Sequence, residues 1–249
     1  MTRGDSDKDR GGGTAIQTTP LTGLKAVAFD LDSTLCEYTL SVEEVLRAAL
    51  LRAGLEADVL GDLSVAAGRY ASSWGEVQEN LQATERIRLH IFEQLLTNCA
   101  SDADATQLSD AYGEVRGETG IRPFDGAREL LHDLKEHYPL GLLTNGPSDI
   151  QWEKVRSLGF GDLFDAIVVA GDVGIYKPDP RVFEILLDRL GVDASATLFV
   201  GDNLELDIVG AHRSGMRTAW IRRNGTRPTE SIAPDVELPD VTFLRKVLL

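Results

Sequence analysis

A buried strand that ends in two aspartates is the feature that most limits how this chain can fold. Residues 25–29 are apolar after an initial lysine, as expected for a strand covered on both faces of a parallel sheet. Asp30 and Asp32 follow at the carboxyl end, where open α/β sheets bind their ligands. Two carboxylates on one turn repel each other, and burying them is costly unless a cation or a proton compensates. A capped turn is the competing interpretation, because aspartate and serine are common in turns.

Three later apolar runs also end in polar residues. These runs have the length and character of buried strands and cover residues 140–143, 166–170 and 197–200. Each is followed by side chains that can supply a hydroxyl, a cation or an acid: Thr144 with Asn145, then Lys177, then Asp202 with Asp207. If all four strands lie in one parallel sheet, these groups converge with the two aspartates on one edge. The ordered set of these groups, rather than any one of them, indicates a common site at this edge of the sheet.

The segment between the first two strands has a helical pattern instead. Ser41 and Glu44 form a capping box, and apolar residues recur at helical spacing in four segments, residues 41–54, part of 59–73, 77–97 and 103–117. From residue 123 onward strands and helices alternate with short connections, with further helices at 125–136, 149–157 and 205–213 and a fifth strand at 217–221. Residues 222–239 are rich in proline and polar residues and are expected to form a surface loop.

We therefore predict an α/β fold, a doubly wound (Rossmann-like) parallel sheet core with an inserted α-helical cap domain. The expected boundaries are a flexible tail at 1–20, the core at 21–36 and 121–249, and the cap at 37–120. Segments near residues 36–40 and 120–124 would connect the two domains.

Composition limits the possible partners. The net charge of -15 argues against nucleic acid. No apolar run approaches the roughly 20 residues needed to cross a bilayer, so we expect no membrane partner. The start of the chain lacks a signal-peptide core, and the two cysteines, Cys36 and Cys99, form no metal-spaced cluster. These features favour a cytoplasmic protein. The oligomeric state, monomer or homodimer, is left open.

The four polar motifs resemble those of the haloacid dehalogenase (HAD) superfamily of hydrolases, and more closely its phosphatases. The run from Asp30 to Thr34 is similar to the family's first motif, Asp-x-Asp-x-Thr, although Ser33 stands where many relatives have glycine. Thr144 is similar to the second motif and Lys177 to the third, while Gly201 and the aspartates after it match the fourth. The resemblance covers roughly residues 24–222, and it places the helical cap between the first and second motifs.

This resemblance implies hydrolysis of a small-molecule phosphomonoester through an aspartyl-phosphate. Asp30 would attack phosphorus, and Asp32 would protonate the leaving oxygen and then activate water. Thr144, with backbone N–H groups around Asn145, would bind the phosphoryl oxygens, and Lys177 would neutralise their charge.

The resemblance also implies a magnesium cofactor. The metal ligands would be the side chains of Asp30 and Asp202 and the backbone carbonyl of Asp32. Asp207, farther along the fourth motif, would hold a metal-bound water or orient a neighbouring side chain.

Other functions stay open. A phosphosugar mutase of the same superfamily keeps the same aspartate pair. A non-catalytic phosphate-binding or receiver-like module also combines acids, a hydroxyl and a lysine, but receivers lack an inserted cap. Dehalogenation is disfavoured by Asp32, because dehalogenases of this group need no second acid. The substrate itself would be recognised by the cap, whose arginines (Arg47, Arg52, Arg69, Arg86 and Arg88) are interpreted as mostly solvent-exposed, and whose Tyr70 and Trp74 are interpreted as packing residues.

Overall fold

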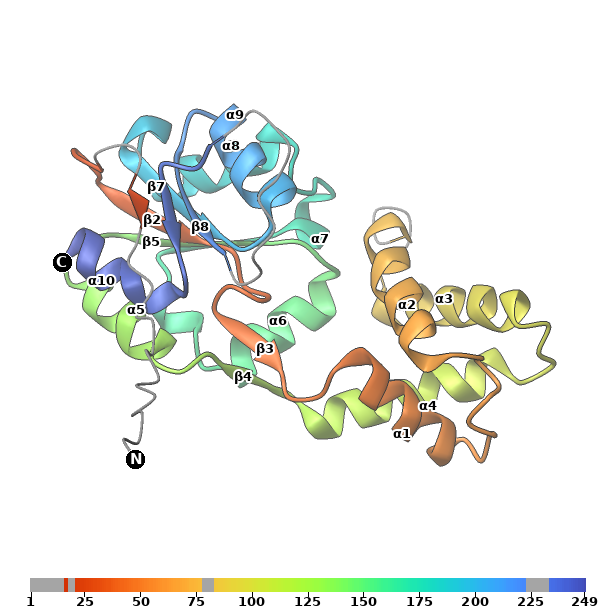
Figure 1. The fold of residues 1–249 in the computed structure, drawn as a ribbon. Helices are drawn as coiled ribbons and strands as arrows, with labels where there is room; N and C mark the ends of the chain where they lie inside the picture. The colour runs from red at the N-terminus through yellow and green to blue at the C-terminus, as the bar shows by residue number, and fades with distance from the viewer. Residues whose placement is uncertain (1–15, 18–20, 78–82, 223–232) are drawn as a thin grey trace, which may run out of the picture.

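The core of the molecule is one twisted sheet with helices on both faces (Figure 1). The computed structural model describes residues 16–17, 21–77, 83–222 and 233–249. Its main sheet has the strand order β1-β9-β8-β7-β2-β5-β6. The strand bounds are β1 Ile16–Gln17, β2 Ala26–Phe29, β5 Leu140–Thr144, β6 Ala166–Val169, β7 Thr197–Gly201, β8 Arg217–Ile221 and β9 Val236–Leu238. All neighbours are parallel except β1 and β9. The predicted fold class is confirmed.

Strand β2 lies in the middle of the sheet because it is apolar on both faces. It pairs with β5 on one side and with β7 on the other, and every residue of the strand is buried. Val27 and Phe29 belong to the hydrophobic cluster on one face, whereas Ala28 belongs to the cluster on the other face. This alternation follows from the two-residue period of a strand. Asp30 is thereby placed at the centre of the carboxyl edge.

Two layers of helices cover the sheet. On one face lie α5 (Ala127–Lys135), α6 (Ser148–Ser157) and α10 (Leu244–Leu248), and on the other lie α8 (Pro180–Leu190) and α9 (Gly210–Arg213) (Figure 1). Asp179 caps α8 and Pro180 occupies its first turn, where the missing N–H of proline costs no hydrogen bond. The short helix α7 (Ala170–Val173) follows β6 directly.

The cap domain has a hydrophobic core of its own. Its helices are α1 (Val42–Arg52), α2 (Leu63–Val77), α3 (Thr84–Asn98) and α4 (Ala105–Thr119), which lie away from the sheet in Figure 1. The buried cluster that joins them includes Leu46, Phe92, Leu108 and Tyr112. The capping box at Ser41 is present. Residue 77 ends α2 rather than beginning the third helix, and residues 78–82 lie outside the described part of the chain.

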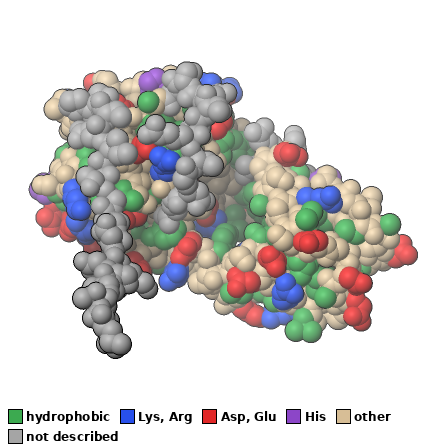
Figure 2. All heavy atoms as spheres, viewed as in Figure 1, with side chains coloured by type: hydrophobic (Ala, Val, Ile, Leu, Met, Phe, Trp, Pro, Cys, Tyr) green, Lys and Arg blue, Asp and Glu red, His purple; other side chains and the backbone are tan. Residues whose placement is uncertain are grey.

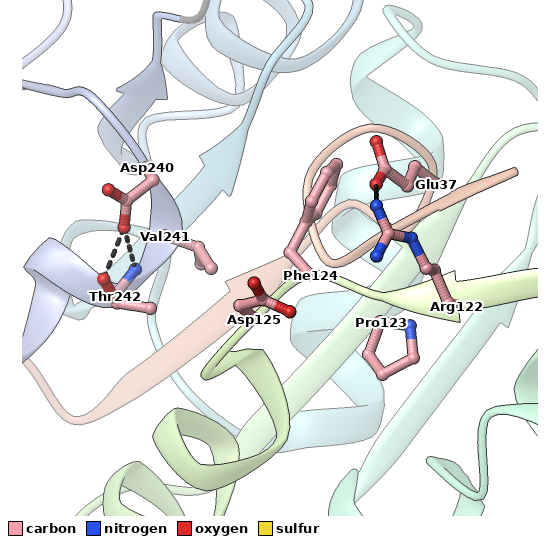
Figure 3. Close-up of a pocket in the computed structure, with 8 residues that line it drawn as sticks. All are labelled: Glu37, Arg122, Pro123, Phe124, Asp125, Asp240, Val241 and Thr242. Atoms are coloured by element: carbon pink, nitrogen blue, oxygen red, sulfur yellow. Dashed lines mark hydrogen bonds and ion pairs between the residues drawn. The ribbon is translucent and has the colours of Figure 1, made fainter. Parts of the chain in front are cut away.

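The cap is joined to the core by a two-stranded ribbon. Strands β3 (Cys36–Tyr38) and β4 (Ile121–Pro123) pair antiparallel where the sequence suggested two separate connecting segments. Figure 3 shows Arg122 of β4 reaching Glu37 of β3, with 2.6 Å between guanidinium and carboxylate. The same view shows the residues that line a cavity between the ribbon and the segment from Asp240 to Thr242. The volume of this cavity is about 280 Å³, and none of the predicted site residues lines it.

Three segments differ from the sequence-based expectations. The expected surface loop at 222–239 contains β9, which pairs with β8, while residues 223–232 lie outside the described residues. The helix expected at 205–213 is a π-helical turn, η3 (Leu204–Val209), followed by α9. Residues 16 and 17, inside the expected flexible tail, form β1 against β9; residues 1–15 and 18–20 are not described.

Among the described residues, no helix is both long enough and apolar enough to cross a membrane.

Candidate active site

A buried lysine links two aspartates from different strand ends. Lys177 Nζ lies 2.7 Å from Asp30 Oδ1 and 2.6 Å from Asp207 Oδ1. All three residues are buried, and Lys177 is only 4 % exposed. The loop after β6 therefore carries Lys177 to the carboxyl end of β2, as the predicted convergence requires. Burial lowers the pKa of Lys177, but the two carboxylates outweigh it and hold the pKa above its usual value.

Three carboxylates gather beside this lysine. One oxygen each from Asp30, Asp202 and Asp207 lie within 4.8 Å of one another. Asp202 follows β7 directly, and its Oδ1 accepts a long hydrogen bond of 3.4 Å from Thr34 Oγ1. Asp207 lies in η3, where its Oδ2 accepts a hydrogen bond from the backbone N–H of Asn203. The fourth motif thus places two carboxylates, those of Asp202 and Asp207, beside Asp30.

Glycine at position 201 is required by the approach of Asp207. A Cβ built on Gly201 would overlap the Cβ and carboxylate of Asp207. The carboxylate therefore packs against the backbone at the end of β7, which only a glycine permits.

The charge balance of this cluster favours a bound cation. Burial, reinforced by Asp207 and Asp202 and opposed by Lys177, raises the pKa of Asp30 from 3.8 to about 8. One lysine is thus insufficient to keep Asp30 fully ionised at neutral pH beside the two other carboxylates. Oxygen ligands of this kind suit a hard divalent cation such as Mg²⁺, whose charge would favour the ionised form of Asp30. The donor set therefore fits the predicted metal.

Asp32 faces a different set of partners. Its two carboxylate oxygens lie 2.7 and 2.8 Å from Lys154 Nζ, and Gln151 Nε2 donates to Oδ2 at 2.9 Å. Burial would raise the pKa of Asp32, but Lys154 and Gln151 outweigh it and hold the pKa below its usual value. The Asp32 side chain is still 40 % exposed, so it is open to a ligand.

Sequence reasoning missed Lys154 and Gln151. Both lie on α6, one helical turn apart, and both are buried. Their i and i+3 spacing places them on one helix face. Nothing in the local pattern reveals that this face packs against the first motif. Gln151 also contacts the Thr144 hydroxyl and the Asn145 carbonyl, and its own Oε1 has no hydrogen-bond partner among the described residues.

Thr144 and Asn145 occupy the end of β5, as predicted. The Thr144 side chain is buried, and its hydroxyl donates to the Asn145 carbonyl at 3.3 Å. The Asn145 side chain is bound to the backbone of Lys177 on both sides, donating to its carbonyl at 3.0 Å and accepting from its N–H at 2.9 Å. The Asn145 side-chain amide therefore braces the loop that carries Lys177.

The turn after β2 carries a strained residue. Ser33 has φ of 63°, in the left-handed region that favours glycine. Its N–H donates to the carbonyl of Cys36 at 2.8 Å, which folds the first motif back toward β3. The serine is accommodated in the turn, with a backbone conformation that explains why glycine is common there in the resembling family.

A cavity of about 500 Å³ lies between the cap and α6 and reaches Asp32 and Asn145. Figure 2 shows a hollow between the two parts of the molecule. The cap contributes Tyr70, Trp74 and Tyr112 to its wall. A ligand held at the strand ends would extend into this space. The interpretation of Tyr70 and Trp74 as packing residues is therefore incomplete, because both also line the cavity.

A family comparison agrees with this arrangement. Residues 24–215 match the family model described as haloacid dehalogenase-like hydrolase. The chain belongs to the haloacid dehalogenase-like hydrolase family. It is also 33% identical to the glyceraldehyde 3-phosphate phosphatase of Methanopyrus kandleri, over 87% of this chain and 91% of the relative. The family assignment and the enzyme class predicted from the motifs are confirmed.

Solved structures similar to this chain include a magnesium-bound HAD hydrolase and a dehalogenase. The YfnB protein of Bacillus subtilis, solved bound to magnesium, matches with a TM-score of 0.73 and 25% identity, over 90% of this chain and 98% of that chain. A 2-haloacid dehalogenase of Pseudomonas syringae matches with a TM-score of 0.65 and 31% identity, over the same shares. The overall likeness therefore does not separate a phosphatase from a dehalogenase. The distinction depends on the residues around Asp30.

Proposed function

We propose that this HAD-family hydrolase is a magnesium-dependent phosphatase that hydrolyses a small-molecule phosphomonoester through an aspartyl-phosphate. The observation that carries the proposal is the cluster of Asp30, Asp202 and Asp207 around Lys177, together with a separate Asp32 at the mouth of the cavity. An acid beside a nucleophile has a use in phosphoryl transfer to water, where a proton must move twice. This separation supports the phosphatase over the dehalogenase.

The proposed reaction has two steps. The Asp30 carboxylate forms a bond to phosphorus while the bond from phosphorus to the ester oxygen breaks, and the departing oxygen takes a proton from Asp32. Asp32 must therefore hold a proton in the substrate complex, although Lys154 and Gln151 lower its pKa in the free protein. Asp32 then takes a proton from water, whose oxygen attacks phosphorus and breaks the bond to Asp30, which releases inorganic phosphate. Lys154 and Gln151 hold the Asp32 carboxylate at the mouth of the cavity.

The remaining predicted residues bind the phosphoryl group in this proposal. Lys177 faces its negative charge, and Thr144 with the backbone at Asn145 orients its oxygens. Asp30, Asp202 and Asp207, with the Asp32 carbonyl, are the oxygen donors that would hold Mg²⁺, directly or through water. When bound, the ion neutralises phosphoryl charge and aligns the nucleophile.

The test is phosphate release from a panel of phosphomonoesters, comparing the wild type with Asp30→Asn. Loss of the nucleophile should lower kcat by a factor on the order of 10⁴ or more. Asp179→Asn, at the cap of α8, is the matched control and should keep activity. Absence of phosphate release from every ester, with Mg²⁺ bound, would contradict the proposal. Interconversion of sugar monophosphates without phosphate release would identify a mutase instead.

A further inference from the structure

The cavity beside Asp32 has two kinds of wall. Tyr70, Trp74 and Tyr112 supply aromatic surface from the cap, while Pro147 and Ile150 supply apolar surface from α6 and the turn before it. Tyr70 and Tyr112 pack with ring centroids 4.8 Å apart, which fixes the shape of the cap wall. The leaving group of a substrate bound at Asp30 would occupy this space, so its chemistry should match the polar groups found there.

Two arginines of the cap wall, Arg88 and Arg116, form no ion pair with a carboxylate among the described residues. Arg116 uses both terminal nitrogens on the Leu40 carbonyl and the Tyr112 hydroxyl. Arg88 differs, because its terminal nitrogens donate no hydrogen bond within the described part of the chain.

Arg88 lies on α3 and is half-buried, and its Nε donates to Ser109 Oγ at 3.2 Å. Its guanidinium lies against Gly113 of α4, where a Cβ would come within 2.6 Å of Cζ. Among the described residues, no ion pair joins Arg88 to a carboxylate. Several arginines in the described ranges do form such pairs, among them Arg52 and Arg122.

Arg88 lines two cavities, and the charged residues around them differ. The acids that line the cavity next to the active site are Asp32 and Glu37, and these are paired with Lys154 and Arg122. A second cavity, which shares Arg88, Arg116 and Lys154 with the first, is lined in addition by five acids: Glu85, Asp110, Glu114, Asp149 and Glu153. The larger number of acids disfavours an anion in the second cavity, so the first cavity is the better place for an anion to meet Arg88.

We propose that the substrate's leaving group carries a carboxylate, which the Arg88 guanidinium binds. This inference rests on the proposed phosphatase function and narrows its substrate class to phosphomonoesters of hydroxy acids. The planar guanidinium matches a carboxylate with two parallel hydrogen bonds, and Ser109 and Gly113 fix its position. A half-buried cation in the cap of a chain with net charge -15 gains its counter-ion when such a substrate binds. Arg88 is thus a specificity-determining residue, contrary to its interpretation as solvent-exposed.

The test compares esters that differ only in the carboxylate. One pair is 3-phosphoglycerate and glycerol 3-phosphate, and a larger pair that fills the aromatic cavity is 4-carboxyphenyl phosphate and phenyl phosphate. The wild type should prefer the acid of at least one pair by kcat/KM. Arg88→Met should lower kcat/KM for that acid by about 10- to 100-fold, the range expected for a lost charge-assisted hydrogen bond, and mainly through KM. The neutral ester should change by less than about threefold under the same reasoning.

Arg86→Met is the matched control, because Arg86 lies on the exposed side of the same helix. It should leave both members of each pair unchanged. Equal losses on acid and neutral ester in Arg88→Met, or no preference of the wild type for either acid, would overturn the carboxylate assignment while leaving the phosphatase intact. A loss confined to a bisphosphate probe would also overturn it in favour of a second phosphate. Failure of the proposed function gives a different result, namely no hydrolysis of any ester.

Discussion

Asp30 is subject to opposing influences on its proton equilibrium. Burial and two neighbouring carboxylates raise its pKa to about 8, while Lys177 opposes them. Asp30, the nucleophile in our proposal, is therefore partly protonated near neutral pH unless a cation binds. The local charge thus couples the binding of a cation to the ionisation of Asp30.

This coupling predicts how stability depends on pH without metal. A carboxyl with a higher pKa in the folded state binds more protons when folded than when unfolded. Its contribution to the free energy of unfolding therefore falls as the pH rises from about 3.8 to about 8. In EDTA, Asp30→Asn should be no more stable than the wild type at pH 4 and several degrees more stable in Tm at pH 8, measured by calorimetry. A Tm difference independent of pH would contradict the raised pKa.

The conformation of Ser33 predicts a small gain on substitution. Glycine adopts φ of 63° without steric cost, whereas serine does not. The greater freedom of glycine in the unfolded chain offsets part of the gain. Ser33→Gly should stabilise the protein by about 0.5–1 kcal/mol in urea unfolding. Ser33→Ala retains the Cβ and should show no such gain; equal effects of both substitutions would exclude backbone strain as the cause.

At the scale of elements, the end of β7 shows how closely two segments meet. Gly201→Ala should displace Asp207 and with it the Lys177 ion pair, because the new Cβ overlaps the carboxylate. We expect weaker Mg²⁺ binding by calorimetric titration and a loss of stability of about 1–3 kcal/mol, as for other overpacked sites.

Gly68→Ala serves as the comparison for that substitution. Gly68 lies within α2 and has open space around its Cα. Alanine there should stabilise the helix by about 0.5–1 kcal/mol and leave Mg²⁺ binding unchanged. Unaltered Mg²⁺ affinity in Gly201→Ala would show that Asp207 does not need its observed position.

The site residues that the sequence predicts share one property. Asp30 and Asp202 directly follow parallel strands and Thr144 is the last residue of one, and parallel strands end on the same edge. Lys154 has no such marker, since only the packing of α6 brings it to Asp32. Strand β9 was not predicted, because its three residues, between Pro234 and Pro239, are too few to show the two-residue period of a strand.

The cap illustrates a further limit of sequence patterns. Helical spacing identified the capping box at Ser41 and four helices, because each must bury an apolar face. The role of Arg88 depends on which cap face is turned toward α6, and local spacing carries no information about that docking. The boundary between α2 and α3 was also misplaced, because Ser73 and Gly75, residue types common in turns, lie inside α2, which continues to Val77.

At the scale of the whole molecule, the two domains have separate hydrophobic cores. Leu108 belongs to the cap cluster and Leu142 to the sheet cluster, and both are fully buried. Each Leu→Ala substitution should cost about 2–5 kcal/mol within its own domain. In hydrogen exchange, Leu108→Ala should increase exchange in α1–α4 and leave β2, β5 and β7 protected, with Mg²⁺ affinity unchanged.

Leu142→Ala should give the opposite pattern, increasing exchange in the sheet and weakening Mg²⁺ binding. A uniform increase across both domains in either variant would show that they unfold as a single cooperative unit.

The ribbon of β3 and β4 has a consequence for how such enzymes can diversify. Cys36 lies opposite Pro123, so the chain leaves the core and returns to it at neighbouring points. An inserted unit whose ends lie side by side can be replaced without altering any pairing of the main sheet. Recombination at this ribbon could therefore supply the same phosphoryl chemistry with a new recognition surface in a single genetic event.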